Sequence, residues 1–163
     1  RACRRSGRVK LTSCCRIGGR PFNARCVGRT LTFVRPQINP VLTDFCKQLT
    51  SIQQADVDSA GTYVEVGQEL GGFIARYPNA AWASWGDYDA RQLERDAGFA
   101  ACPSLLEGLP HFNARKWHAG LYDNRPKSLK QTVEAMGLVW QGTYHRGIDD
   151  ARNVASIVKE MLS

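Results

Sequence analysis

The last twenty residues of the chain, YHRGIDDARNVASIVKEMLS (144–163), place a histidine, two adjacent acids and a long apolar stripe close together. The apolar side chains recur at the spacing of an α-helix, so we expect a helix from about Asp149 to Leu162. Its apolar face consists of Val154, Ile157, Val158, Met161 and Leu162. A helix with such a face packs against a core, and this packing fixes the direction of its other side chains.

The two acids differ in their expected direction. Asp150 lies four residues before Val154 and therefore points toward the core, whereas Asp149 is predicted to face water and to cap the helix. A buried carboxylate is unfavourable unless a metal ion or a strong hydrogen-bond network compensates it. His145 precedes the acids by one short glycine-containing loop, and histidine is the side chain best suited to taking a proton from water near neutral pH. The spacing alone favours a structural hydrogen bond.

A third acid lies in SWGDYDARQLERD (84–96). Asp89 follows the predicted buried strand 80–86, opens a predicted helix and shares the core-facing side with Leu93 and Ala97. Asp87 is interpreted as a turn residue. Carboxylates that converge from separate elements are typical ligands of Mg²⁺ or Mn²⁺.

The remaining pattern alternates strands with helices, which favours an α/β fold. Residues 30–36 are predicted as a strand, and 41–49 as a helix with Val41, Leu42, Phe45 and Leu49 on its buried face. Residues 51–58 are expected to form a short helical piece, and the stripe over 61–78 a helix packed on a sheet. Segment 110–122 is predicted as helix or a mixture of helix and loop. A helix is expected after Ser128, its predicted N-cap, with Gly137 just past its end.

The charge divides the chain into two expected regions, a leader (1–29) and a folded domain (30–163). The leader holds nine basic residues, four of the six cysteines and no acid, whereas the domain holds the other 13 basic and all 15 acidic residues. The leader is interpreted either as a nucleic-acid-binding arm or as an unstructured or wrongly translated segment. No signal-peptide pattern and no run of about 20 apolar residues is seen, and we expect a cytoplasmic protein.

The segments HRGIDDARN, SWGDYD and FVRPQINPVLTDFCKQLTSIQQADVD together resemble the DEDDh family of 3′-to-5′ exonucleases, in particular the RNase T-like branch with the histone-mRNA and small-interfering-RNA exonucleases. The resemblance covers about residues 30–163. It implies an RNase H-like fold with a mixed central sheet flanked by helices. It also implies hydrolysis of the terminal phosphodiester of single-stranded RNA or DNA by two Mg²⁺ or Mn²⁺ ions.

Carried over onto this sequence, the resemblance makes Asp89 and Asp150 metal ligands and His145 the general base. The family's first motif, Asp-x-Glu, has no counterpart, because the first carboxylate in the chain is Asp44. A shifted reading frame over the leader is one hypothesis for this loss. With two carboxylates instead of four, we expect weak metal binding, a lost or altered N-terminal strand region, lower stability, and low or no activity. The alternative function is a catalytically inactive nucleic-acid-binding protein of the same fold.

Several other residues leave two interpretations open. Trp82 and Trp85 either pack in the core, which is favoured, or stack on bases. His111 and His118 are more readily explained by a surface or packing role than by metal binding. Arg125, Lys127 and Lys130 contact a nucleic-acid backbone or are solvated surface charges, and the sequence favours neither. Arg152 pairs with a carboxylate or with a phosphate.

Overall fold

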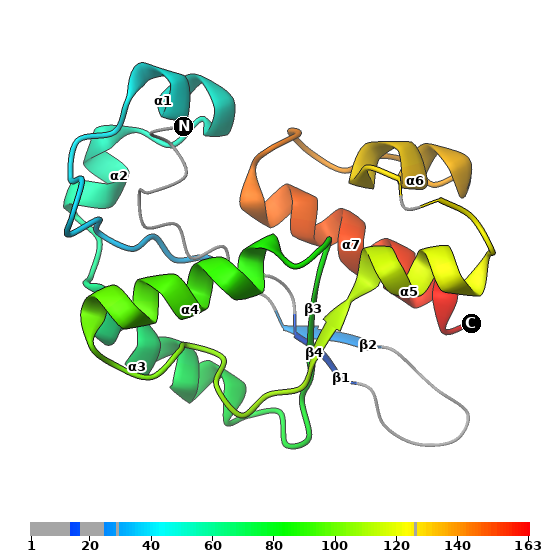
Figure 1. The fold of residues 1–163 in the computed structure, drawn as a ribbon, viewed down its shortest axis with the longest axis horizontal. Coiled ribbons are helices and arrows are strands. Elements are labelled where there is room, and N and C mark those ends of the chain that lie inside the picture. Colours follow the sequence, from blue (N-terminus) through cyan, green and yellow to red (C-terminus); the bar gives the residue numbers. More distant parts are fainter. Residues whose placement is uncertain (1–13, 17–24, 29, 126) are drawn as a thin grey trace.

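The computed structural model describes residues 14–16, 25–28, 30–125 and 127–163. These residues form two pairs of short strands and a larger set of helices (Figure 1). The strands are β1 (Cys14–Arg16), β2 (Arg25–Gly28), β3 (Trp82–Ser84) and β4 (His111–Asn113). The helices are α1 (Asp44–Thr50), α2 (Gln54–Asp58), α3 (Tyr63–Ile74), α4 (Tyr88–Ala100), α5 (Ala114–Leu121), α6 (Leu129–Ala135) and α7 (Gly147–Met161).

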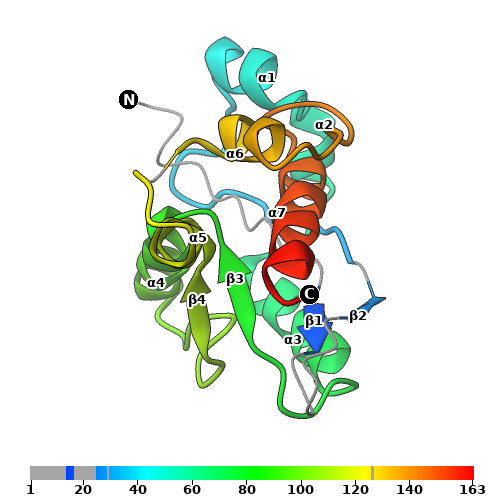
Figure 2. The same cartoon turned by 90° about the vertical axis from the view of Figure 1, so that its right-hand side faces the viewer.

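The strands pair two by two in the described part of the chain. β1 pairs antiparallel with β2, and β3 pairs parallel with β4, with Trp82 opposite His111 and Ser84 opposite Asn113. Figure 2 shows β3 and β4 side by side, and in Figure 1 α3 and α4 pack together on one side of this pair while α5 packs with α7 on the other. The α/β class predicted from the alternating pattern is therefore confirmed, with its strands in two separate pairs.

Two hydrophobic clusters hold the helices on this sheet. The first joins α3 to α4 and includes Val66, Leu70, Phe73 and Leu93, with Trp82 packed against it. The second lies between α5, α6 and α7 and includes Val133, Val154 and Ile157, with Trp85 and Trp117 at its edge. The predicted apolar faces of α3 and α7 are thus confirmed, and both tryptophans of the strand region contribute to core packing.

Helix starts follow the local sequence signals. Ser128 caps α6, since its hydroxyl accepts the Gln131 N–H while the Gln131 side chain accepts the Ser128 N–H, a reciprocal capping box. Thr62 and Glu65 form the same arrangement at the start of α3. Gly137 follows α6 with a φ of +68°, a conformation that glycine adopts without strain. The predicted N-cap and terminator of α6 are both confirmed.

Two local predictions are wrong. Residues 30–36 form no regular strand: the Arg35 N–H donates to the Gly61 carbonyl at 2.9 Å, and Val34 is buried in the first cluster. In segment 110–122 the predicted helix is present as α5, but its first residues are a strand and not helix or loop, because His111–Asn113 pair with β3. The parallel pairing with a distant strand overrides the local helical pattern there.

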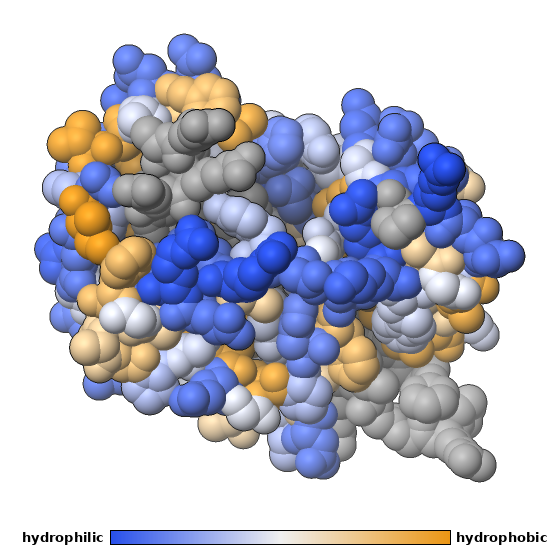
Figure 3. All heavy atoms as spheres, in the orientation of Figure 1, coloured by the Kyte–Doolittle hydropathy of each residue, from blue (hydrophilic) through white to orange (hydrophobic). Residues whose placement is uncertain are grey.

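The predicted face of α1 is also wrong. Val41, Phe45 and Leu49 are exposed, whereas Cys46 and Thr50 are buried, and of the predicted set only Leu42 lies inside. α1 and α2 share the small cluster formed by Leu42, Cys46 and Val57. Hydrophobic residues therefore gather on the outer surface over α1 and α2 (Figure 3). In the described residues, no helix has both the length and the apolar character that crossing a bilayer requires.

Candidate functional site

The turn after β3 carries two acids with different surroundings. Asp87 accepts hydrogen bonds from Asn113 Nδ2 at 2.6 Å and from Lys116 Nζ at 2.9 Å. The hydrogen bonds from Lys116 and Asn113 lower the pKa of Asp87 below its ordinary value. Asp87 therefore ties the end of β3 to β4 and α5, and its prediction as a turn residue is confirmed.

Asp89 lies two residues further on, in the first turn of α4. Its side chain is half-buried and stands one helical turn before the buried Leu93, on the side predicted from the sequence. Because α4 follows directly from β3 and packs on it, Asp89 sits at the carboxyl end of the parallel strand pair. Ligands of open α/β sheets bind at this end.

His111 lies beside these acids, which the sequence did not indicate. Its Nε2 lies 2.8 Å from Ser84 Oγ, and the same hydroxyl donates to the Gly86 carbonyl at 2.7 Å, so Ser84 accepts from His111. Burial lowers the pKa of His111, while the negative charges of Asp87, Asp89 and Glu94 act in the opposite direction. The signal that places His111 there is the pairing of β4 with β3, which is not local in sequence.

At the start of α7 the structure joins two of the predicted site residues. The backbone N–H of His145 donates to Asp150 Oδ1 at 3.2 Å, and both side chains are half-buried. The imidazole of His145 lies against the ring of Tyr144, with 3.9 Å between ring centroids. The backbone of His145 is left-handed, with a φ of +66°, a conformation found at few non-glycine residues.

The predicted roles of the neighbouring acid are wrong. α7 begins at Gly147 with Arg146 as its N-cap residue, so Asp149 does not cap the helix. Asp149 is buried, and it accepts the Thr143 N–H at 2.9 Å and a hydrogen bond from Arg152. The loop before α7 folds back over the first turn of the helix and covers the side predicted to face water. Asp150 remains half-buried rather than fully buried.

The same fold-back involves an amide on the next turn of α7. Asn153 is 1% exposed; its Nδ2 donates to the carbonyls of Gln141 and Asp149, at 2.9 and 2.7 Å, and its Oδ1 accepts the Gln141 N–H. Gly142 lies against the Asp149 carboxylate with a φ of +77°. Asp149 and Asn153 thus hold the loop that carries His145 onto α7, a function that the sequence analysis did not assign to them.

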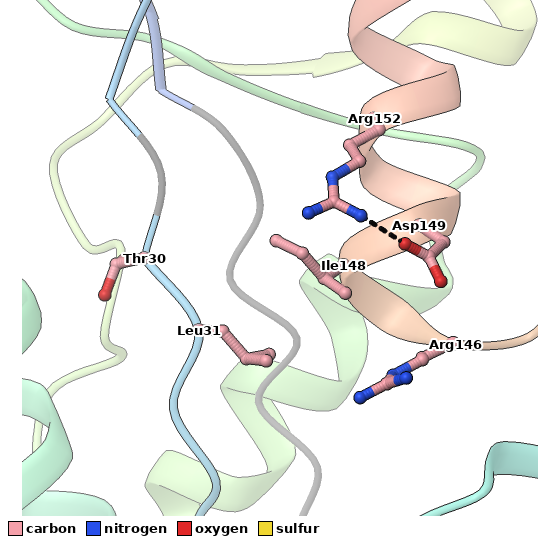
Figure 4. A pocket seen from close by; sticks show the side chains of 6 residues that line it. All are labelled: Thr30, Leu31, Arg146, Ile148, Asp149 and Arg152. Carbon is pink, nitrogen blue, oxygen red and sulfur yellow. Dashed lines mark hydrogen bonds and ion pairs between the residues drawn. The ribbon is translucent and has the colours of Figure 1, made fainter. Parts of the chain in front are cut away.

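A pocket lies beside this helix start. It is lined by Thr30, Leu31, Arg146, Ile148, Asp149 and Arg152. In Figure 4 the Arg152 guanidinium reaches toward the Asp149 carboxylate, and Leu31 lies across the pocket from α7. Of the two partners left open for Arg152, the structure shows the carboxylate.

The structure therefore brings together only some of the three predicted site residues, Asp89, His145 and Asp150. His145 and Asp150 are hydrogen-bonded neighbours, and Asp89 lies on a different helix; both helices contact β3. Among the described residues, no group of three or more His, Cys, Asp or Glu side chains is arranged to hold a metal ion. A common pocket for Asp89, His145 and Asp150 remains a prediction.

Comparison with known proteins identifies the class. The family model described as Exonuclease, RNase T, matches residues 22–158, and the chain belongs to this exonuclease family. In solved structures, the fold is similar to the nuclease domain of 3′hExo, a DEDDh family member bound to rAMP. That likeness has a TM-score of 0.77 at 26% identity and covers 85% of this chain and 73% of that one. The fold is thus RNase H-like.

Two curated relatives are similar in sequence. The 3′-5′ exonuclease eri1 of Schizosaccharomyces pombe is 33% identical over 162 residues, which cover 81% of this chain and 54% of the relative. The human 3′-5′ exoribonuclease 1 is 29% identical over 140 residues, covering 80% of this chain and 40% of the relative. The chain therefore spans about half, or less, of the length of these relatives. A further structure of similar fold, with a TM-score of 0.77 at 25% identity, concerns 3′-end recognition of the histone mRNA stem-loop by 3′-exonuclease.

Proposed function

We propose that this chain is a 3′-to-5′ exonuclease domain that acts on the 3′ ends of single-stranded RNA or DNA. The observation that carries the proposal is the junction of His145 and Asp150 at the start of α7, in a chain that belongs to the exonuclease family. Its relatives named as 3′-5′ exonucleases and exoribonucleases support the same direction of cleavage. A cytoplasmic location remains a prediction.

His145 is proposed as the group that accepts a proton from the attacking water. The hydrogen bond from its backbone to Asp150 and the ring contact with Tyr144 fix the loop from which the imidazole projects. Histidine is the side chain that most often carries out such proton transfer in enzymes. Asp149 and Asn153 contribute by holding this loop on α7.

Mg²⁺ or Mn²⁺ is proposed as the cofactor, with Asp89 and Asp150 as ligands. Carboxylate oxygens suit these ions, which in such enzymes activate water and neutralise developing charge. The described residues do not fit a pair of ions, because they offer no group of three candidate ligands. The proposal therefore includes weak metal binding and low or no exonuclease activity.

The lack of a three-ligand metal group among the described residues favours a second candidate, a catalytically inactive nucleic-acid-binding domain. One assay separates the two candidate functions. An oligonucleotide labelled on an internal nucleotide is incubated with the protein in Mg²⁺, in Mn²⁺ or in EDTA. The parent chain is compared with the His145→Ala variant and with Lys47→Gln, a surface control on α1. Metal-dependent shortening that is lost only in His145→Ala supports the exonuclease. Binding without shortening in any metal supports the second candidate, and the absence of both binding and shortening contradicts both.

A further inference from the structure

The segment that joins β4, α5 and α6 has a charge unlike that of the rest of the domain. Between residues 114 and 131 there are five basic side chains and one acidic side chain, although acids outnumber bases over residues 30–163. Arg125, Lys127 and Lys130 are exposed, and in the described part of the chain none of the three forms an ion pair. We refer to these three residues as the α5–α6 basic surface.

Two contacts tie this surface to the candidate site. Trp85, in the turn between β3 and Asp89, donates its Nε1–H to the Lys127 carbonyl at 3.2 Å. Arg115 donates to the same carbonyl at 2.9 Å. The backbone of Lys127 is therefore fixed beside the turn that leads to Asp89, while its ammonium group extends into solvent.

Aromatic rings accompany the charges. The rings of Trp85, His118 and Tyr122 follow one another with centroid separations of 6.3 and 4.7 Å. Trp85 and His118 lie inward, while Tyr122 is 48% exposed at the outer end of this series. Desolvation lowers the pKa of His118, so its ring is favoured in the neutral form. Tyr122 therefore presents an open ring on the same segment as the basic surface, three residues before Arg125.

From these observations we infer that the α5–α6 basic surface binds the sugar–phosphate backbone of a single-stranded nucleic acid whose 3′ end lies at the candidate site. Exposed cations beside an aromatic ring are the arrangement that holds single strands without reading their sequence. Lys127, Lys130 and Arg125 contact phosphates, and Tyr122 stacks on a base. This inference rests on the proposed function for the position of the 3′ end.

The test measures binding rather than cleavage. Anisotropy of a fluorescein-labelled oligo(U) and of a matching oligo(dT) is followed in EDTA over a range of KCl concentrations. The variant Lys127→Gln/Lys130→Gln is compared with Lys47→Gln/Arg76→Gln, which removes the same charge from α1 and from the segment after α3. Each lost phosphate contact lowers the slope of log affinity against log salt by about 0.7. We expect a smaller slope by about 1.4, and weaker binding at low salt, in the first double variant alone.

A separate pair of variants tests the proposed stacking of Tyr122 on a base. Tyr122→Ala is expected to weaken oligonucleotide binding roughly tenfold, whereas Tyr122→Phe keeps the ring and most of the affinity. Thermal melts of all variants exclude unfolding as the cause. Equal slopes in the two double variants overturn the inference, as does an undetectable affinity of the parent chain. Metal-dependent trimming that persists with equal slopes leaves the proposed function standing without this surface.

Discussion

Gly142 lies directly against the carboxylate of Asp149: a Cβ added to Gly142 would come within 2.2 Å of the Asp149 Cγ and 2.5 Å of both carboxylate oxygens. Glycine is therefore required at this position for two reasons, the close approach to the carboxylate and the φ of +77°. The contact allows the buried carboxylate to accept the Thr143 N–H and to hold the loop that carries His145.

Substitution Gly142→Ala is expected to destabilise the fold by about 2 kcal/mol or more, because backbone strain alone contributes roughly 1–3 kcal/mol. Denaturant unfolding followed by circular dichroism measures the change. Gly72→Ala in α3 is the matched control, since a Cβ there meets nothing within 4 Å. This control is expected to be stabilising by about 0.5–1 kcal/mol. Equal effects of the two substitutions would contradict the role of the close contact.

Asn153→Ala removes the amide that bonds the loop to α7. We expect a loss of about 1–3 kcal/mol of stability, because Gln141 loses both partners of its backbone groups. Hydrogen exchange should also become faster at the amides of Thr143 and His145. Ser156→Ala removes the hydroxyl that accepts from the Gln141 side chain and donates to the Arg152 carbonyl of its own helix, and it should change stability by less than about 0.5 kcal/mol. Unchanged exchange in Asn153→Ala would show that the loop is held by other contacts.

Asp96→Asn should stabilise the protein at neutral pH. Burial raises the pKa of Asp96, with the Gln92 hydrogen bond and the charge of Arg95 acting against it, and one of its oxygens has no hydrogen-bond partner among the described residues. A raised pKa in the folded state means that the favourable contribution is present at low pH and is lost as pH rises through the folded pKa. The melting temperature of Asp96→Asn should therefore exceed that of the parent by a few degrees at pH 7. The difference should shrink on acidification below the ordinary range of aspartate.

Asp87→Asn should show the opposite dependence on pH. Hydrogen bonds from Lys116 and Asn113 lower the pKa of Asp87, so its contribution is present above the unfolded pKa and is lost as pH falls through the folded pKa. The variant should melt at a lower temperature than the parent at pH 7 and at the same temperature in strong acid. Asp44→Asn on α1, which removes an exposed i,i+3 ion pair with Lys47, is the control. A constant deficit at every pH would exclude the ionised carboxylate as the cause.

The sequence predicted those elements whose signals are local. The stripe of α3, the N-cap of α6 and the apolar face of α7 each depend on residues within a few turns of one another. Their positions followed from helical periodicity and from hydrogen bonds between neighbours. Family membership was also accessible, because the three segments that resemble the exonucleases contain most of the candidate site.

The predictions failed where distant segments decide the outcome. Asp149 was expected in water because the periodicity of α7 does not register the loop that folds back over it. The exposed side of α1 could not be told from the buried side, because the partner of Cys46 and Leu42 is Val57 of the following helix. His111 was expected in a surface or packing role, because the pairing of its strand with β3, which brings it under the charges of Asp87 and Asp89, is not local in sequence.

His145 occupies a left-handed backbone conformation in which a Cβ is unfavourable by about 1–2 kcal/mol. Glycine would relieve this strain. His145→Gly is therefore expected to melt at a higher temperature than His145→Ala, although both variants lack the imidazole. The backbone conformation and the proton transfer proposed for His145 therefore make opposing demands on one position of the loop. A library selected for thermal tolerance alone should replace this histidine early, and such a gain would remove the proton acceptor that the proposed function requires.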